Sequence, residues 1–183
     1  MSDTSDVVEA IASLAGEHDF GVATAESLTC GQLAADLGAG PDASTWFRGG
    51  VVAYASRVKF DVLGVTPGPV VTDRCAREMA AGAAELLQAD AVVSTTGVGG
   101  PDVEEGEPPG TVHVAVQVRG NTTSVRLELS GDPAEVLAQT RVRALDLLHD
   151  AMRADVQTVS APPRPDTARD GGPADSPSRA ASR

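Results

Sequence analysis

The 183-residue chain has few of the residues that mark secreted, metal-binding or membrane proteins. It contains two cysteines, Cys30 and Cys75, 3% aromatic residues and no apolar run as long as a membrane span. Its three histidines lack metal-ligand spacing, and no positively charged, apolar leader opens the chain. We therefore expect a cytoplasmic protein with free thiols that uses neither a metal nor a cofactor.

Positive charge is also scarce, and nearly all of it is arginine. The formal net charge of −12 disfavours nucleic acid or a membrane surface as a partner. Of the 14 basic residues only Lys59 is a lysine, and it follows the single tyrosine, Tyr54, by five positions. Lysine can lose its proton, whereas arginine in practice cannot. The lone lysine either marks a position that needs such an amine or stands there by chance.

Apolar residues follow strand and helix periods in alternation, which predicts a single α/β domain with three layers and a mixed, mostly parallel sheet. We expect this domain to span residues 1–155. The expected strands are 20–25, 49–55, 89–96, 111–118 and 124–129, and the main helices are one from about residue 7, 31–37, 72–87 capped by Thr72, and one that starts at Asp132-Pro133-Ala134-Glu135 and reaches about Met152.

Residues 156–183 are expected to form a disordered tail. From Ala161 to Arg183 the sequence has five prolines and no Val, Ile, Leu, Met or aromatic residue. Such a segment cannot bury enough apolar surface to offset the entropy lost on ordering.

Three loops that follow expected strands carry unusual chemistry. They are Thr24–Gly31 ("TAESLTCG"), Tyr54–Lys59 ("YASRVK") and the glycine-rich Thr95–Val112 ("TTGVGGPDVEEGEPPGTV"). In α/β sheets, sites form beyond the carboxyl ends of the strands. We therefore expect any active site to combine these loops.

Ser27 has two interpretations. A hydroxyl at the start of a helix most often accepts a backbone N–H as a cap. Alternatively, Ser27 is a nucleophile, with a neutral Lys59 as its base and Tyr54 relaying or holding the proton. Cys30, beside the same helix start, is a weaker alternative nucleophile, and a Ser-His dyad stays open.

The glycines of the third loop do not form a dinucleotide-binding fingerprint. That motif requires a helix directly after the glycines, whereas Gly97-Val98-Gly99-Gly100 is followed by Pro101 and an acidic stretch. The loop is either a close-approach wall of a pocket or a flexible turn.

The three loops also match, in order, a set of family motifs: A-E-S-x-T-G-G, then G-G-x-x-x-Y with a lysine five residues later, then T-G-x-x-G-P followed by G-T-V. The matching residues are Ala25, Glu26, Ser27, Thr29 and Gly31; Gly49, Gly50, Tyr54 and Lys59; and Thr96, Gly97, Gly100, Pro101, Gly110, Thr111 and Val112. The chain thus resembles the bacterial CinA C-terminal domain family and its stand-alone form, the PncC-type nicotinamide-nucleotide amidase. The match covers essentially the whole expected domain.

The resemblance implies a five-stranded α/β/α sandwich, often a homodimer, that converts nicotinamide mononucleotide (NMN) into nicotinate mononucleotide and ammonia in pyridine-nucleotide recycling. It implies Ser27 as nucleophile, Lys59 as general base and Tyr54 as an assisting residue. Neither a metal, nucleic acid nor a membrane is implied, and the chain resembles the stand-alone type. The expected substrate-binding residues are Glu26, Thr29, Cys30, Gly31, Arg48, Thr96, Gly97, Gly100 and Gly110.

Some positions depart from the family pattern. Cys30 stands where glycine is usual, and Pro133 stands where an arginine is common. The glycine-rich loop carries three glutamates at 104, 105 and 107, which would disfavour a phosphate nearby, so Arg48 or Arg57 is the expected phosphate ligand. These departures leave two alternatives open: a nucleotide-binding module that has lost turnover, or an amidase for another small amide.

Overall fold

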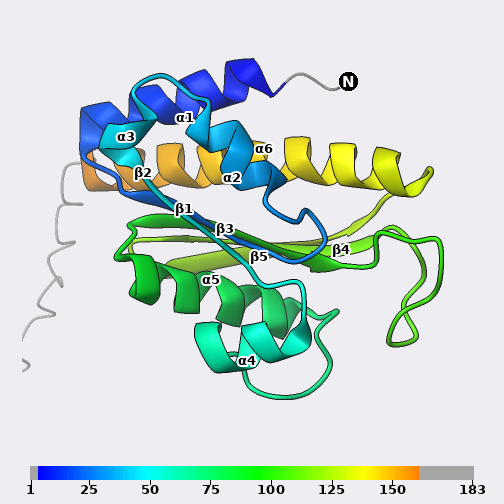
Figure 1. Cartoon of the computed structure of the whole chain (residues 1–183). Coiled ribbons are helices and arrows are strands. Elements are labelled where there is room, and N and C mark those ends of the chain that lie inside the picture. The colour runs from blue at the N-terminus through cyan, green and yellow to red at the C-terminus, as the bar shows by residue number, and fades with distance from the viewer. Residues whose placement is uncertain (1–3, 161–183) are drawn as a thin grey trace, which may run out of the picture.

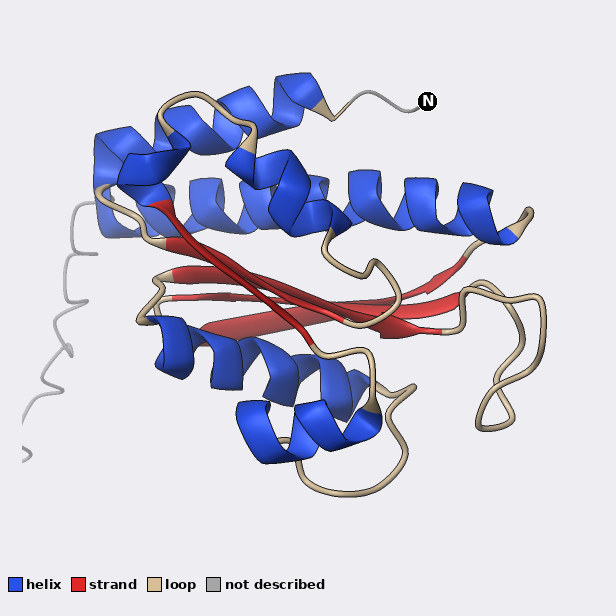
Figure 2. Cartoon of the chain, in the orientation of Figure 1, coloured by secondary structure: helices blue, strands red, loops and turns tan. Residues whose placement is uncertain are grey.

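The structure is a computed structural model that describes residues 4–160 as a twisted sheet between two helical layers (Figures 1 and 2). In chain order its elements are α1 Ser5–His18, β1 Val22–Glu26, α2 Gln32–Gly38, α3 Ala43–Trp46, β2 Phe47–Val52, α4 Ser56–Leu63, α5 Asp73–Leu87, β3 Ala91–Gly97, β4 Thr111–Val118, β5 Asn121–Glu128 and α6 Pro133–Ser160. Helices α1, α2, α3 and α6 lie on one side of the sheet, and α4 and α5 lie on the other.

The sheet has the strand order β2-β1-β3-β4-β5. Strand β1 pairs in parallel with β2 and β3, and β4 pairs antiparallel with β3 and β5. The predicted α/β/α sandwich with a mixed sheet is therefore confirmed. Because β1, β2 and β3 run in one direction, their carboxyl ends meet at one edge, where Glu26 pairs with Val52 and Thr95.

Alternation along β1 divides the interior into two apolar cores. Val22 faces the core shared with α1 and α6, which also contains Ile11. Ala23 and Ala25 face the opposite core, where they pack with Met79 of α5. All five side chains of β1, Val22–Glu26, are fully buried, so β1 is a central strand with no solvent-facing side.

Two helix starts form as the sequence predicts. The Thr72 hydroxyl accepts the Cys75 N–H at 3.1 Å at the start of α5. At the start of α6, Glu135 N–H donates to the Asp132 carboxylate at 2.9 Å, and Asp132 N–H donates to the Glu135 carboxylate at 2.8 Å. This reciprocal capping box holds the first turn of α6 with Pro133 as its first helical residue.

Several bounds differ from the predicted elements: β1 and β2 are shifted from the expected 20–25 and 49–55 to Val22–Glu26 and Phe47–Val52. Strand β5 begins at Asn121 rather than 124, because Arg119 and Gly120 both have positive φ and form a two-residue hairpin turn. The short helix α3 was not predicted. Helix α6 continues through Ser160, so residues 156–160 of the expected tail are helical, while 161–183 lie outside the described residues.

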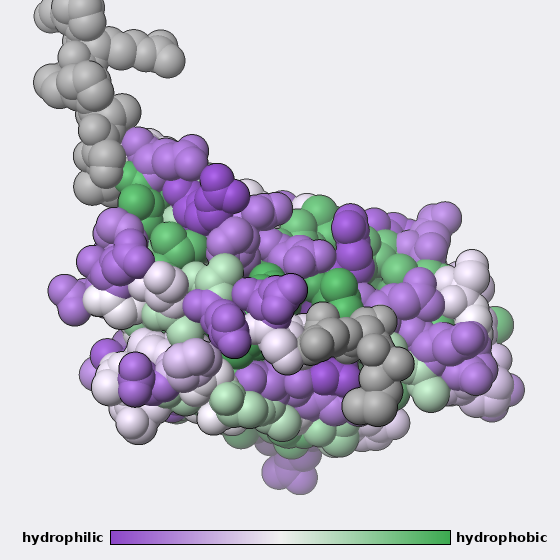
Figure 3. Space-filling view, turned by 90° about the horizontal axis from the view of Figure 1, so that it is seen from above, coloured by the Kyte–Doolittle hydropathy of each residue, from purple (hydrophilic) through white to green (hydrophobic). Residues whose placement is uncertain are grey.

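The surface over α1 and its neighbouring helices intersperses hydrophilic side chains with smaller hydrophobic areas (Figure 3). Among residues 4–160, none of the helices is both long and apolar enough to cross a membrane.

A matched pair of glycine substitutions tests the packing of α4 on α5. Gly82 in α5 lies so close to α4 that a Cβ would overlap the Leu63 carbonyl, whereas a Cβ on Gly16 of α1 would meet nothing within 4 Å. We expect Gly82→Ala to lower the free energy of unfolding by about 1–3 kcal/mol, as overpacking does. Gly16→Ala should raise it by about 0.5–1 kcal/mol through helix propensity. Urea unfolding monitored by circular dichroism measures both, and a stabilised Gly82→Ala variant would contradict the packing.

Candidate active site

Ser27 lies directly beyond the carboxyl end of β1. Its N–H donates to the Thr95 carbonyl at 2.9 Å, which extends the β1–β3 ladder by one residue. The chain then turns sharply: Cys30 N–H donates back to the Ser27 carbonyl at 3.1 Å, and Cys30 and Gly31 both have positive φ. The Ser27 side chain is thereby held at the strand end, and the residue is 8% exposed.

Lys59 reaches Ser27 from the neighbouring strand–helix connection. Lys59 lies in α4, which follows β2 after a short connection. In this connection, Ala53 N–H donates to the carbonyl of Glu26, the last residue of β1, at 2.7 Å. Lys59 Nζ lies 2.9 Å from Ser27 Oγ, 2.7 Å from the Ala53 carbonyl and 3.2 Å from the Tyr54 carbonyl. The residue is 1% exposed, so the amine is enclosed by one hydroxyl and two carbonyl oxygens.

This set of partners suits a neutral amine as well as an ammonium. An ammonium donates three hydrogens, one to each oxygen. A neutral amine donates two hydrogens to the carbonyls of Ala53 and Tyr54, and its lone pair then accepts the Ser27 O–H. The carbonyls cannot donate, so in the neutral state the lone pair has only Ser27 to receive a proton from. A serine hydroxyl that donates to a neutral amine has the geometry that a nucleophile and its base require.

The electrostatic environment favours this neutral form. Burial lowers the pKa of Lys59 below its ordinary value of 10.5, although the negative charges of Glu104 and Glu105 act in the opposite direction. A thiolate at Cys75 would also raise the pKa of Lys59. Burial, however, raises the pKa of the Cys75 thiol to about 11, so it is uncharged near neutral pH and does not. Desolvation therefore dominates at the amine.

Glu26 has a structural position that differs from the expected one. Its carboxylate accepts the N–H groups of Gly31 at 3.0 Å, Leu33 at 3.1 Å and Ala34 at 2.8 Å, and the Thr24 hydroxyl at 3.1 Å. The residue is fully buried. Glu26 was expected to bind substrate, but its carboxylate is used by the backbone N–H groups at the start of α2, where a negative charge is favourable.

The rest of the first loop is also packed rather than open to a ligand. The Thr29 hydroxyl bonds to the Thr95 hydroxyl at 2.8 Å, and both residues are fully buried. Cys30 is an exposed free thiol, and Gly31 serves as the N-cap position of α2. Thr29, Cys30 and Gly31, all expected to bind substrate, lie outside the lining of the cavity beside Ser27.

That cavity has a volume of about 450 Å³ and joins the three predicted loops. Ser27 and Lys59 lie in its wall, together with Thr96, Gly97 and Gly100 of the third loop. The third loop is therefore a pocket wall. Gly110, in contrast, is a backbone position at the far end of the same loop: its N–H donates to the Val98 carbonyl at 2.8 Å, and its positive φ and contact with the Leu129 carbonyl leave no room for a side chain.

Tyr54 lines the cavity with an exposed side chain, 70% accessible to solvent. Its contact with the lysine runs through its backbone carbonyl rather than its hydroxyl. The assisting role of the phenol therefore stays a prediction, while the backbone carbonyl of Tyr54 accepts a hydrogen bond from Lys59.

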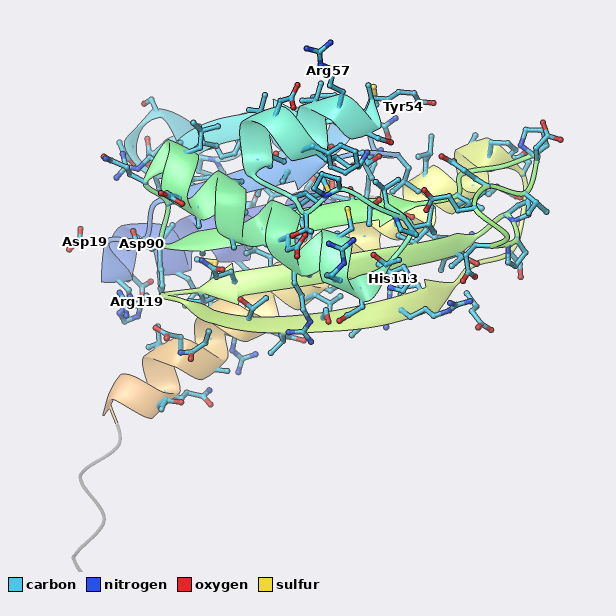
Figure 4. The ribbon with its side chains drawn as sticks, turned by 90° about the horizontal axis from the view of Figure 1, so that it is seen from below. Asp19, Tyr54, Arg57, Asp90, His113 and Arg119 are labelled. Atoms are coloured by element: carbon cyan, nitrogen blue, oxygen red, sulfur yellow. The ribbon has the colours of Figure 1, made fainter. Side chains whose placement is uncertain are left out.

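The two arginines expected to hold a phosphate lie away from the cavity. Arg48 packs over Gly21, whose N–H bonds to Asp90, at the start of β1. Figure 4 shows Asp90 at the opposite end of the sheet from Tyr54. The five residues of β1, which runs between these ends, span about 13 Å. Arg57 points away from the ribbon in the same view and pairs with Asp61 at 2.8 Å. Neither residue lines the cavity.

Sequence reasoning missed several wall residues, which come from segments distant in the chain. They are Leu28, Ser56, Val70, Val71, Val98, Gly99, Asp102, Val103, Glu104, Pro133 and Leu137. The acidic loop is tied to one of these segments: the Glu105 carboxylate accepts the N–H groups of Val70 at 2.7 Å and Val71 at 2.8 Å. The sequence shows that this loop is acidic, but it does not show which backbone N–H groups Glu105 contacts.

His113 is not part of the cavity wall. It lies on β4, where its Nδ1 is buried without a hydrogen-bond partner among the described residues. Burial lowers its pKa, with Arg126 as a further cause. Within residues 4–160, no histidine lines the cavity, and the basic side chain in contact with Ser27 is Lys59.

The fold and this site define a three-layer α/β protein with a buried serine–lysine pair at the carboxyl edge of its parallel strands. The model of the CinA C-terminal domain family matches residues 4–152. The chain belongs to this family, which confirms the resemblance seen in its motifs.

Individual relatives agree with this assignment. A protein of Geobacillus kaustophilus, named as competence-damage inducible, is 40% identical over 146 residues, covering 76% of this chain and 35% of that protein. A CinA-like protein of Frankia casuarinae is 41% identical over 132 residues, covering 69% of this chain and 30% of that protein. The chain thus spans about a third of the length of the curated relatives it matches.

Solved structures of similar length share the fold. A CinA superfamily protein from Klebsiella pneumoniae has a TM-score of 0.80 and 31% identity, and the match covers 84% of this chain and 99% of that one. One from Escherichia coli has a TM-score of 0.77 and 32% identity, with 81% and 92% covered.

The lowered pKa of Lys59 predicts a specific dependence of stability on pH. Between its lowered pKa and about 10.4, the folded amine binds fewer protons than the unfolded one, so its contribution to the free energy of unfolding rises with pH. We expect the difference in unfolding free energy between wild type and Lys59→Met to move in favour of wild type from pH 7 to pH 10. Denaturant titrations at several pH values measure this difference. A difference that is constant or falls with pH would contradict the assignment.

Proposed function

We propose that the protein is an amidohydrolase that uses Ser27 and Lys59 to hydrolyse the carboxamide of NMN, giving nicotinate mononucleotide and ammonia. The observation that carries this proposal is the buried contact of 2.9 Å between Lys59 Nζ and Ser27 Oγ at the wall of a cavity. The substrate itself is inferred from the likeness to the nicotinamide-nucleotide amidases, and the reaction would serve pyridine-nucleotide recycling. The free thiols of Cys30 and Cys75 fit a cytoplasmic location.

The first half of the reaction transfers the serine proton. Neutral Lys59 accepts the proton of Ser27 O–H while Oγ attacks the carboxamide carbon and the C=O electrons move onto oxygen. The ammonium that forms keeps two hydrogen bonds, to the carbonyls of Ala53 and Tyr54, so the new charge is not left unpartnered. Its third hydrogen goes to the amide nitrogen, the C–N bond breaks, and ammonia leaves.

The second half returns the enzyme to its starting state. Water gives a proton to neutral Lys59 and its oxygen attacks the acyl carbon, the C–Oγ bond breaks, and Ser27 recovers its proton from the lysine. Carboxamide and water are thus converted into carboxylate and ammonium. An alternative with the same residues is direct attack of a lysine-activated water on the amide.

The developing oxyanion requires a donor that is not already used. Ser27 N–H is bonded to Thr95, and the N–H groups at the start of α2 are bonded to Glu26. We assign the role to the N–H of Leu28, which follows the nucleophile, lines the cavity and has no acceptor in the part of the chain that the structure describes.

Ammonia release from NMN by the purified protein tests the proposal. We expect Ser27→Ala to lower kcat/KM by about 10³-fold or more, because the attacking atom is removed. Lys59→Arg should lower it by about 10²–10⁴-fold, because arginine keeps the charge but cannot act as a base. Arg153→Gln, which removes an exposed cation on α6, is the control and should retain wild-type activity.

The outcomes separate the alternatives. Undiminished activity in Ser27→Ala or Lys59→Arg would refute the serine–lysine mechanism. Tight NMN binding by wild type without ammonia release would instead favour a binding module without turnover. Mass spectrometry after an acid quench distinguishes an acyl group on Ser27 from direct water attack.

A further inference from the structure

The charged residues around the cavity have one sign beyond the catalytic lysine. Among the described wall residues, the ionisable side chains at neutral pH are Lys59, Asp102 and Glu104. Lys59 is 1% exposed and all its donor capacity is used by three oxygen atoms, so it is not available to a substrate anion. The field inside the cavity is therefore set by carboxylates.

These carboxylates lie at the outer part of the cavity. Asp102 and Glu104 are exposed, whereas Ser27 is 8% exposed. A carboxamide that reaches Ser27 Oγ sits at the less exposed end of the cavity. We infer that the substituent on the pyridine ring then extends toward the more exposed acidic loop. Glu105, whose carboxylate is fixed by the N–H groups of Val70 and Val71, adds a third negative charge behind this rim.

Among the described wall residues, no arginine and no second lysine offsets this charge at the rim. Pro133 and Leu137 at the start of α6 add apolar side chains to the wall, with Pro133 close to Gly100 of the third loop, and Arg48 and Arg57 lie elsewhere. Among the described wall residues, the hydrogen-bond donors available to a phosphate are neutral groups such as the Ser56 hydroxyl. A phosphate monoester carries a charge of about −1.5 to −2 at pH 7, so like charges would meet here.

A positively charged ring, in contrast, is favoured at the same place. The Glu104 and Glu105 charges already reach the buried amine, since they act on the pKa of Lys59. The same field would stabilise the positive charge of a pyridinium beside Ser27, as it stabilises the ammonium form of Lys59. The exposed aromatic ring of Tyr54 in the wall adds an attraction for cations.

We propose that this site selects a cationic pyridinium amide that lacks a phosphate, so that nicotinamide riboside is a better substrate than NMN. The proposal rests on the amidase function proposed above and concerns which member of that substrate class the cavity prefers. Asp102 and Glu104 are its specificity-determining residues, and they act by repelling the phosphate.

The test compares kcat/KM for ammonia release from nicotinamide riboside and from NMN at low ionic strength. We expect wild type to prefer the riboside by about fivefold or more, a ratio that falls toward one as salt screens the carboxylates. Asp102→Asn and Glu104→Gln should each reduce the preference by improving NMN turnover. Glu85→Gln, which removes an exposed carboxylate on α5, is the matched control and should leave the ratio unchanged.

A charge introduced at Pro133, beside the third loop, gives a second arm of the test. Pro133 is the first residue of α6, and the capping box of Asp132 and Glu135 does not depend on its side chain. We expect Pro133→Arg to raise kcat/KM for NMN by about fivefold or more relative to the riboside, because it supplies the missing phosphate partner.

The result that overturns the proposal is a wild type that prefers NMN, or a preference that Asp102→Asn, Glu104→Gln and Pro133→Arg do not move. Hydrolysis of neither substrate would instead overturn the amidase function. Calorimetric titration of Ser27→Ala with both compounds then still decides the charge preference, since tighter binding of NMN would refute it and tighter binding of the riboside would support it.

Discussion

The structure of this site depends on one buried amine. Lys59 lies in a space that water scarcely reaches, with two backbone carbonyls and the Ser27 hydroxyl around its nitrogen. Placing a charge there is costly, so the environment favours the neutral amine that a base requires. The carbonyls also supply the partners that the ammonium needs once the proton has moved. The same two contacts therefore serve both protonation states.

The neighbouring framework keeps this pair in place without using the substrate. The Glu26 carboxylate accepts the N–H groups at the start of α2. Its backbone carbonyl accepts the N–H of Ala53, which lies in the segment between β2 and the helix of Lys59. One residue thus joins the loop of the nucleophile to the strand end that precedes the base. The acidic loop is held in a similar way through Glu105, so the third wall of the cavity is also fixed by a carboxylate that accepts backbone N–H groups.

Much of the fold and the central pair were predictable from the sequence. Strand and helix periods indicated the sandwich, and parallel strand ends necessarily place the loops of Ser27 and Lys59 at one edge. The role of Glu26 was not predictable, because no spacing rule tells that a side chain will reach N–H groups five to eight residues ahead. Arg48 lies near the start of β2 and packs over Gly21, so the direction of the strand puts it at the opposite end of β2 from the site.

The wall formed by Pro133 and the acidic loop could be identified only in three dimensions. Pro133 begins α6, which packs on the face of the sheet opposite to α5. The sequence alone does not indicate that Pro133 lines the same cavity as Ser27. The charge of the cavity follows from this assembly. Without it, the acidic loop is a composition feature with no stated neighbour.

The central claim, that Lys59 is a base poised beside Ser27, is tested most directly by its own titration. Because Lys59 is the single lysine of the chain, protein labelled with ¹³C and ¹⁵N only at lysine gives one side-chain signal to follow by NMR. We predict a titration midpoint clearly below the ordinary value of 10.5 in the folded protein. A midpoint at or above 10.5 would show a stable ammonium and would contradict the mechanism.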